Sequence, residues 1–214
     1  ELCFMYELVS KKEYKPIREK IELIIRKVQK ILRKENPKIT FQFKLVGSGS
    51  RHLITRIKGG NTGYDFDYNL IANISSKTDP VIREHFFHVF QKAIKNSIFN
   101  KIENSKSVIT IKSVSKKNSK VLVGCDFSII CYSNKDLSYH YFAKFNKKEN
   151  NYIWNIRSIS KDNNKKLLWL KNNYSGFWNE LKKEYLKLKN NDKQNKHSFI
   201  LYYESINNIY NKYH

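Results

Sequence analysis

Cysteine, acidic residues and long apolar runs are all scarce in this sequence of 214 residues. The three cysteines have no paired spacing, so they form neither a disulfide framework nor a zinc-binding motif. A reducing compartment is therefore the simplest setting, and we expect a cytoplasmic protein. No apolar run is as long as a membrane span, so we expect no membrane partner. Residues 1–5 lack the basic segment and long apolar core of a signal peptide.

The deficit of acidic residues leaves a strongly basic chain. There are 41 Lys and Arg against 19 Asp and Glu, which gives a formal net charge of +22. Such a charge attracts phosphate polymers, and RNA is therefore one open partner. Lys, Asn, Ile and Tyr are nevertheless abundant throughout, a usage that an AT-rich genome alone produces. The basic residues form no single arginine-rich stripe, so the charge does not by itself indicate nucleic-acid binding.

Periodic apolar residues predict helices at both ends of the chain. Over residues 17–32 the apolar side chains recur at helical spacing, with Pro16 in the predicted first turn and Pro37 beyond the end. Asp79 and Pro80 predict the start of a second helix, as N-cap and first helical residue. After residue 160 the apolar spacing is again helical through to the C-terminus.

Apolar and alternating runs predict strands between these helices. The predicted strands are residues 39–46, 66–74, 108–114, 121–131, 139–145 and 152–156. The runs at 108–114 and 121–131 flank a short polar segment, which predicts a hairpin.

Two aspartates separated by one residue stand at the start of the second strand. Asp65 and Asp67 would project from the same face of that strand, about 6–7 Å apart. Two neighbouring carboxylates repel each other unless a cation lies between them. Mg²⁺, or Mn²⁺ in its place, is the natural candidate, because it takes oxygen ligands from carboxylates and substrate phosphates. Two exposed aspartates at a strand start are also common without any such function.

A glycine-serine turn precedes this pair. Gly47, Ser48, Gly49, Ser50 and Arg51 offer backbone N–H groups, hydroxyls and a guanidinium to a phosphate. The alternative is a linker-like turn followed by a surface arginine.

A third aspartate lies within an apolar strand. Asp126 shares its face with the small residues Gly124 and Ser128, whereas Cys125 and Phe127 point the other way. Small neighbours leave room for a ligand beside the carboxylate. If Asp126 belongs with Asp65 and Asp67, its strand must lie next to theirs, with the carboxylates on one face. The alternative is an edge-strand aspartate that faces water.

The order of these motifs resembles the DNA polymerase β superfamily of nucleotidyltransferases. That family has a Gly-Ser turn, an Asp-x-Asp pair on the next strand and a third carboxylate on a later strand. The resemblance covers residues 39–131. One departure is the long connection between Ser48 and Asp65, in which residues 59–63 read as an inserted loop.

The resemblance implies an α+β fold with a small mixed β-sheet core covered by helices. We expect a nucleotidyltransferase core over residues 1–160 and a C-terminal helical module, residues 161–214, packed on it. A nucleotide would bind between these two parts.

The implied activity is transfer of a nucleoside monophosphate from an NTP, ATP being one candidate, to an acceptor hydroxyl with release of pyrophosphate. Asp65, Asp67 and Asp126 would be the catalytic metal ligands, and the glycine-serine turn would hold phosphates. On the helical side, Lys196, His197 and Ser198 precede the last helix, where N–H groups favour anions, although a plain helix cap explains them equally well. The acceptor could be RNA, a small molecule or a protein, and the product linear or cyclic. The alternative is a non-catalytic nucleotide- or RNA-binding module that retains the fold.

Overall fold

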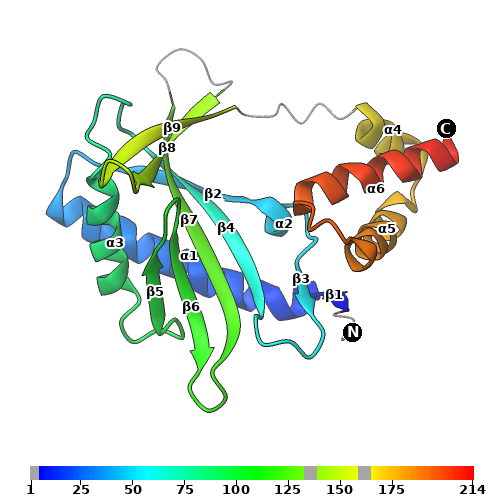
Figure 1. Cartoon of the computed structure of the whole chain (residues 1–214), viewed down its shortest axis with the longest axis horizontal. Helices are drawn as coiled ribbons and strands as arrows, with labels where there is room; N and C mark the ends of the chain where they lie inside the picture. Colours follow the sequence, from blue (N-terminus) through cyan, green and yellow to red (C-terminus); the bar gives the residue numbers. More distant parts are fainter. Residues whose placement is uncertain (1–4, 133–138, 159–164) are drawn as a thin grey trace.

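A mixed β-sheet and two groups of helices make up the computed structural model, which describes residues 5–132, 139–158 and 165–214 (Figure 1). The helices are α1 (Lys11–Glu35), α2 (Gly47–Ser50), α3 (Ile82–Ala93), α4 (Lys165–Asn173), α5 (Phe177–Asn191) and α6 (Ser198–Tyr213). The strands are β1 (Tyr6–Leu8), β2 (Phe41–Val46), β3 (Thr55–Ile57), β4 (Tyr64–Ala72), β5 (Lys101–Asn104), β6 (Ile109–Ser115), β7 (Lys120–Tyr132), β8 (Tyr139–Asn146) and β9 (Asn151–Ser158). The expected α+β fold is confirmed.

The main sheet has seven strands, in the order β2-β4-β7-β6-β5; β8 also pairs with β7, and β9 pairs with β8. Among the strands of the described residues, only β4 and β7 pair in parallel, and the predicted β6–β7 hairpin is present. In β4 burial alternates strictly, so Phe66, Tyr68 and Leu70 are at most 1% exposed while their neighbours reach the other face. This alternation is what a sheet covered on one face requires.

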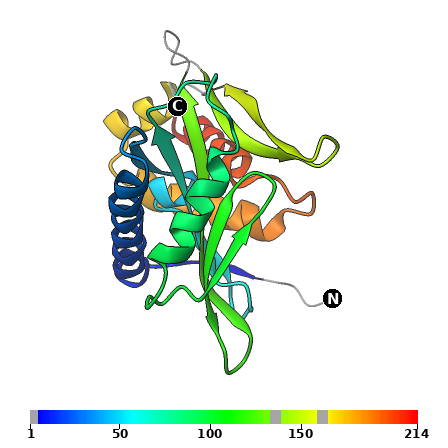
Figure 2. The ribbon, with the colours of Figure 1, turned by 90° about the vertical axis from the view of Figure 1, so that its left-hand side faces the viewer.

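Helices α1 and α3 lie side by side on the buried face (Figure 2). Their apolar stripes pack on Phe66 and Tyr68 of β4 and on Cys125 and Phe127 of β7. Cys125 and Cys131 are both buried free thiols, and Cys3 lies outside the described residues. The opposite face of β4 and β7 therefore carries the polar residues of these strands.

Helix α1 begins earlier than the sequence indicates. Ser10 is its N-cap and accepts a hydrogen bond from the Glu13 N–H, and Tyr14 in the first turn is only 2% exposed. Pro16 therefore stands inside the helix, not in its first turn, and that prediction was wrong. The cap and the burial of Tyr14 offset the backbone hydrogen bond that a proline removes.

Helix α3 begins later than predicted. The Asp79 carboxylate does accept a hydrogen bond from the Val81 N–H, at 2.9 Å. The next three N–H groups, however, bond to carbonyls three residues back, so a tight turn precedes the first α-helical residue, Ile82. Asp79 thus caps this turn and not the α-helix itself.

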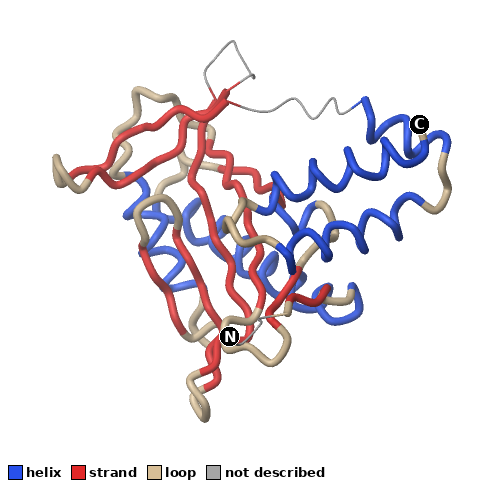
Figure 3. The backbone as a smooth tube through the Cα atoms, turned by 45° about the vertical axis from the view of Figure 1, so that its right-hand side comes forward, coloured by secondary structure: helices blue, strands red, loops and turns tan. Residues whose placement is uncertain are grey.

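The three C-terminal helices are grouped beside the sheet and have their own apolar core (Figure 3). Leu170, Leu181 and Ile206 are fully buried there, and Leu53 from the connection before β3 joins them. The Tyr6 N–H of β1 also donates to the Asn190 side chain of α5 at 2.6 Å. The expected boundary between residues 160 and 161 lies outside the described residues.

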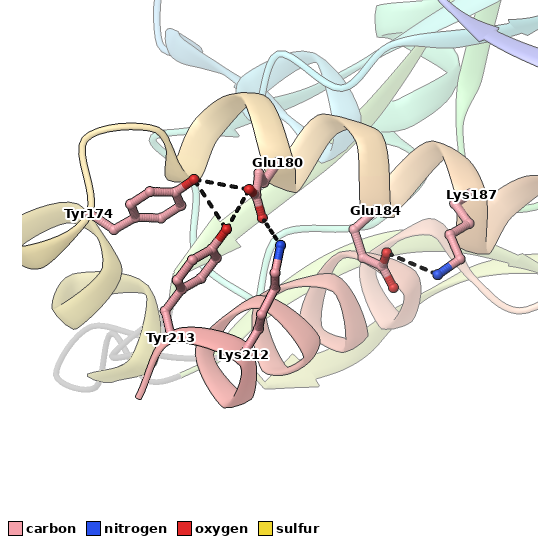
Figure 4. Close-up of polar contacts among 6 residues, drawn as sticks. All are labelled: Tyr174, Glu180, Glu184, Lys187, Lys212 and Tyr213. Atoms are coloured by element: carbon pink, nitrogen blue, oxygen red, sulfur yellow. Dashed lines mark hydrogen bonds and ion pairs between the residues drawn. The ribbon is translucent and has the colours of Figure 1, made fainter.

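A polar cluster joins the start of α5 to the end of α6 (Figure 4). The hydroxyls of Tyr174 and Tyr213 donate to the Glu180 carboxylate, and Lys212 pairs with it at 3.1 Å.

Among the described residues, no helix is both long and apolar enough to cross a membrane.

Candidate active site

The candidate site is built on the neighbouring strands β4 and β7. In their parallel register Asp67 is the partner of Asp126, and Asp65 is the partner of Gly124. Paired residues of adjacent strands point to the same face of the sheet. The expectation that the Asp126 strand lies beside the Asp65 strand, with its carboxylate on the same face, is therefore confirmed.

Gly47 holds the glycine-serine turn directly against Asp67. The turn forms one helical turn, α2, and Gly47 begins it with φ +64°, which a residue with a Cβ rarely adopts. A Cβ on Gly47 would lie 2.6 Å from Asp67 Oδ2, so the close approach also requires glycine. The Ser50 hydroxyl donates to the Gly47 carbonyl at 2.8 Å and closes the turn. The turn thus brings backbone groups to the carboxylate, as a phosphate holder beside a metal site would.

A pocket of about 500 Å³ opens beside these groups. Gly47, Arg51, Asp67 and Asp126 line its sheet side. The rest of its lining includes Asn69, Val108, Ser128 and Arg157 from the strands and nearby turns, and Phe199 and Tyr203 from α6. The pocket is therefore a junction between the sheet and the helical module, with carboxylates on one side and aromatic rings on the other.

Burial and mutual repulsion perturb the carboxylates. Burial, followed by the charges of Asp126 and Asp65, raises the pKa of Asp67 to about 6. Burial and the Asp126 charge also raise the pKa of Asp65, while Lys112 opposes this. Burial raises the pKa of Asp126, and the hydrogen bond from the Thr110 hydroxyl, at 2.5 Å, opposes the rise. The charge of Asp126 thus raises the pKa of both other carboxylates, and that of Asp65 raises the pKa of Asp67. A cation among the three would stabilise their ionised forms.

The donor set fits a hard divalent cation such as Mg²⁺, which prefers a few carboxylate oxygens plus ligand phosphates. Asp67 and Asp126 both line the pocket. Asp65 does not line it. Its Oδ1 lies against Gly124, only 2.2 Å from the position that a Cβ on Gly124 would occupy. As the side chains stand, no group of three or more His, Cys, Asp or Glu in the described part of the chain could hold a metal ion. The metal site of the three aspartates therefore stays a prediction.

Of the predicted nucleotide-binding residues other than Gly47, all of which lie in the described part of the chain, only Arg51 lines the pocket. Ser48, Gly49 and Ser50 belong to α2, and Gly49 is buried against Leu45 and Phe66. Arg51 lies over the Tyr202 ring of α6, with its guanidinium carbon 4.8 Å from the ring centre. The helical turn and α6 are thus joined through this arginine.

Lys196, His197 and Ser198 precede or begin α6 but do not line the pocket in the described residues. Lys196 pairs with Glu204 at 2.7 Å, and His197 stacks on Phe199. Ser198 instead accepts a hydrogen bond from Lys189 at 3.4 Å.

Lys189 is a candidate that the sequence did not single out. Its ammonium lies 4.8 Å from the centre of the Tyr6 ring and 5.8 Å from that of Tyr185, and burial lowers its pKa. Burial raises the pKa of Tyr185, and a hydrogen bond with Ser198 and the charge of Arg51 oppose this rise. In a chain with 41 Lys and Arg, sequence spacing gives no signal for one half-buried lysine.

Comparison with solved structures identifies the fold. The chain is similar to Vibrio cholerae DncV in its 3′-deoxy GTP bound form, with a TM-score of 0.61 and 13% identity over 94% of this chain and 66% of that one. It is also similar to the STING-associated CdnE c-di-GMP synthase of Capnocytophaga granulosa, with a TM-score of 0.59 and 19% identity over 97% and 63%. E. coli CdnC with ATP gives a TM-score of 0.54 and 14% identity over 97% and 62%.

These structural neighbours are CD-NTases, nucleotidyltransferases of the polymerase β superfamily, and the chain shares their fold. It spans less than two thirds of the length of each of the three. No protein-family model matches the sequence, and no curated protein matches it either.

Proposed function

We propose that this protein is a metal-dependent nucleotidyltransferase that moves a nucleoside monophosphate from an NTP to an acceptor hydroxyl. The observation that carries the proposal is the register of Asp67 with Asp126 in one pocket, with Gly47 against Asp67. The nucleotidyltransferase fold of the neighbours supports it. The alternative of a binding module without turnover is the outcome that the experiment below would reveal.

In the proposed reaction, the acceptor oxygen attacks the α-phosphorus of the NTP and loses its proton to solvent water. The bond from the α-phosphorus to the bridging oxygen breaks, and pyrophosphate leaves. Asp65, Asp67 and Asp126 would hold Mg²⁺ or Mn²⁺, which when bound would stabilise charge on the attacking and leaving oxygens. The mutually repelling carboxylates supply the negative charge that such a cation requires.

Cationic and helical groups would hold the triphosphate. The N–H groups of the α2 turn and the Ser48 hydroxyl would bind phosphate oxygens beside Asp67. Arg51, which lines the pocket, and Lys189, which lies beside Tyr185, would add positive charge. Lys196 and His197 have smaller parts in this proposal, because Lys196 pairs with Glu204 and His197 stacks on Phe199.

Aromatic side chains of α6 would contact the base. Phe199, 50% exposed, and Tyr203 line the pocket opposite the carboxylates. Exposed rings beside a phosphate site offer faces on which any base can stack, so the arrangement does not select one NTP. RNA, a small molecule, a protein hydroxyl and a second nucleotide, giving a linear or cyclic product, are all possible acceptors.

The test is to incubate the chain with each labelled NTP and Mg²⁺ or Mn²⁺, with and without added RNA, and to separate the products. We expect metal-dependent pyrophosphate release that Asp67→Asn or Asp126→Asn abolishes. Glu149→Gln, which removes a carboxylate from the exposed turn between β8 and β9, is the matched control and should turn over like the wild type.

Asp126→Ala separates catalysis from binding. It should keep metal-dependent NTP binding, since Asp65 and Asp67 remain, and lose transfer by orders of magnitude. Metal-dependent NTP binding without any product in the wild type would favour the non-catalytic module. Equal binding in excess chelator would indicate a simple basic anion site.

A further inference from the structure

The outer surface of α1 and α3 carries an apolar groove that plays no part in the proposed chemistry. A cavity of about 540 Å³ lies between α1 and the segment that follows α3, and Leu23, Ile98 and Phe99 belong to its lining. We call it the α1–α3 groove; the two helices that form it are side by side in Figure 2. No residue lines both this groove and the pocket that contains Asp67 and Asp126.

Leu23 is out of place for a folded monomer. It is 65% exposed, more than any other large apolar side chain among the described residues. The opposite face of α1 already supplies the core, with Ile21, Ile25 and Val28 fully buried. Leu23 therefore contributes nothing to that core, and it lies beside Ile98 and Phe99 in the lining of one open cavity.

The groove continues beyond α1 towards the tip of the β6–β7 hairpin. A second cavity, of about 630 Å³, shares Lys20 and Ile98 with the first and reaches Leu122. Ile98 is 38% exposed and Leu122 is 48% exposed. Leu23, Ile98 and Leu122 thus line two cavities that share residues and form one continuous depression. The apolar face of an amphipathic helix covers surfaces of this kind.

The rim of the α1–α3 groove carries only positive charge. Lys20, Lys27 and Lys95 line it, and its lining includes no Asp or Glu. None of these lysines takes part in an ion pair between described residues. In the adjoining cavity, Glu7 and Glu13 are both paired with Arg56. Three unpaired cations around an apolar floor select an occupant that is acidic and apolar together.

We propose that the α1–α3 groove is a docking site for an acidic amphipathic segment of a partner protein. Apolar side chains of the segment would cover Leu23 and Ile98, and its carboxylates would meet Lys20, Lys27 and Lys95. A second copy of this chain is a poor occupant, because two molecules with a net charge of +22 repel each other. Because Leu23 is largely exposed, the partner must cover it with an apolar surface. A single acyl chain, as a lipid would offer, needs an enclosed cavity instead.

The probe for this proposal is a fluorescein-labelled helical peptide of about 14 residues, with leucines at i, i+3, i+4 and i+7 and glutamates elsewhere. Binding to the full chain is followed by anisotropy in chelator without nucleotide, so the result is independent of turnover. We expect saturable binding that weakens with added salt. A peptide of the same composition with its leucines scrambled off one face should bind at least about tenfold more weakly.

Two pairs of variants locate the site. Leu23→Glu should weaken peptide binding at least about tenfold, whereas Leu168→Glu, at a similarly exposed leucine of α4, should change it less than about twofold. Lys27→Glu should weaken it at low salt, and Lys148→Glu, in the exposed turn between β8 and β9, should not. Both groove positions are exposed, so circular dichroism should show unchanged folding.

Several results would overturn the proposal. These are no binding of the acidic peptide, equal losses in the groove and control variants, or a photo-crosslink from the peptide to a site outside α1, residues 93–99 and residues 120–123. Tighter Leu23-dependent binding of single-stranded RNA or of phosphatidylserine vesicles would assign the groove to another class of partner. A dimer in sedimentation that Leu23→Glu dissociates would assign it to self-association.

Discussion

Replacing Asp67 with asparagine should stabilise the metal-free protein at neutral pH. The ordinary aspartate pKa is 3.8, and the folded protein raises that of Asp67 to about 6. Below the lower value both the folded and unfolded chains hold the proton, so the free energy of unfolding is unaffected. Between the two values the unfolded chain ionises first, and stability falls as pH rises; above about 6 the whole penalty applies. Asparagine carries no charge and removes the penalty.

The magnitude follows from the two pKa values. Their difference corresponds to at most about 3 kcal/mol, and solvent around the half-exposed carboxylate reduces this to about 1–2 kcal/mol. Urea unfolding in EDTA at pH 4 and pH 7.5 measures it. The gain of Asp67→Asn over wild type should be present at pH 7.5 and nearly absent at pH 4, and Glu149→Gln should show no such gain. A gain of equal size at both pH values, or none at pH 7.5, would refute the electrostatic account of the site.

Three further outcomes are expected. Gly47→Ala should lose about 1–2 kcal/mol from its φ of +64° and also NTP turnover, because its Cβ would meet the Asp67 carboxylate; Gly59→Ala, at φ +70° with open space, should show the backbone cost alone in the same urea and turnover assays. Arg83→Met should lose at least about 3 kcal/mol in urea unfolding, because the fully buried guanidinium donates to several carbonyl oxygens that would be left unsatisfied. The hydrogen bond from Tyr213, followed by those from Lys212 and Tyr174, lowers the pKa of Glu180, so the stability that Glu180 contributes is present above its unfolded pKa and is lost as pH falls through its folded pKa. Tyr213→Phe should therefore flatten the fall of unfolding free energy at acid pH, and an unchanged fall would contradict this.

The carboxylate strands could be predicted because short-range rules decide them. Alternation in β4 places the Asp67 side chain on the sheet face that points away from the core. The small residues around Asp126 mark a face with free space. The pairing of β4 with β7 could be expected from the resemblance, and the register confirms it.

Other features depend on contacts between distant residues. Helix α1 starts before Pro16 because Ser10 caps it and Tyr14 is buried, and neither effect is visible in the apolar spacing alone. Lys189 becomes notable only when the fold places Tyr6 and Tyr185 on either side of it. The lining of the α1–α3 groove similarly joins Lys20 to Ile98, far apart in the chain.

The hydrogen bond between Tyr6 and Asn190 has a consequence for how the protein is made. The two residues are 184 positions apart, so β1 cannot be fastened to α5 until almost the whole described chain has left the ribosome. Leu53 is likewise covered only when the C-terminal helices arrive. Until α5 and α6 have been made, Leu53 and the β1 backbone at Tyr6 therefore lack the contacts that they have in the folded protein.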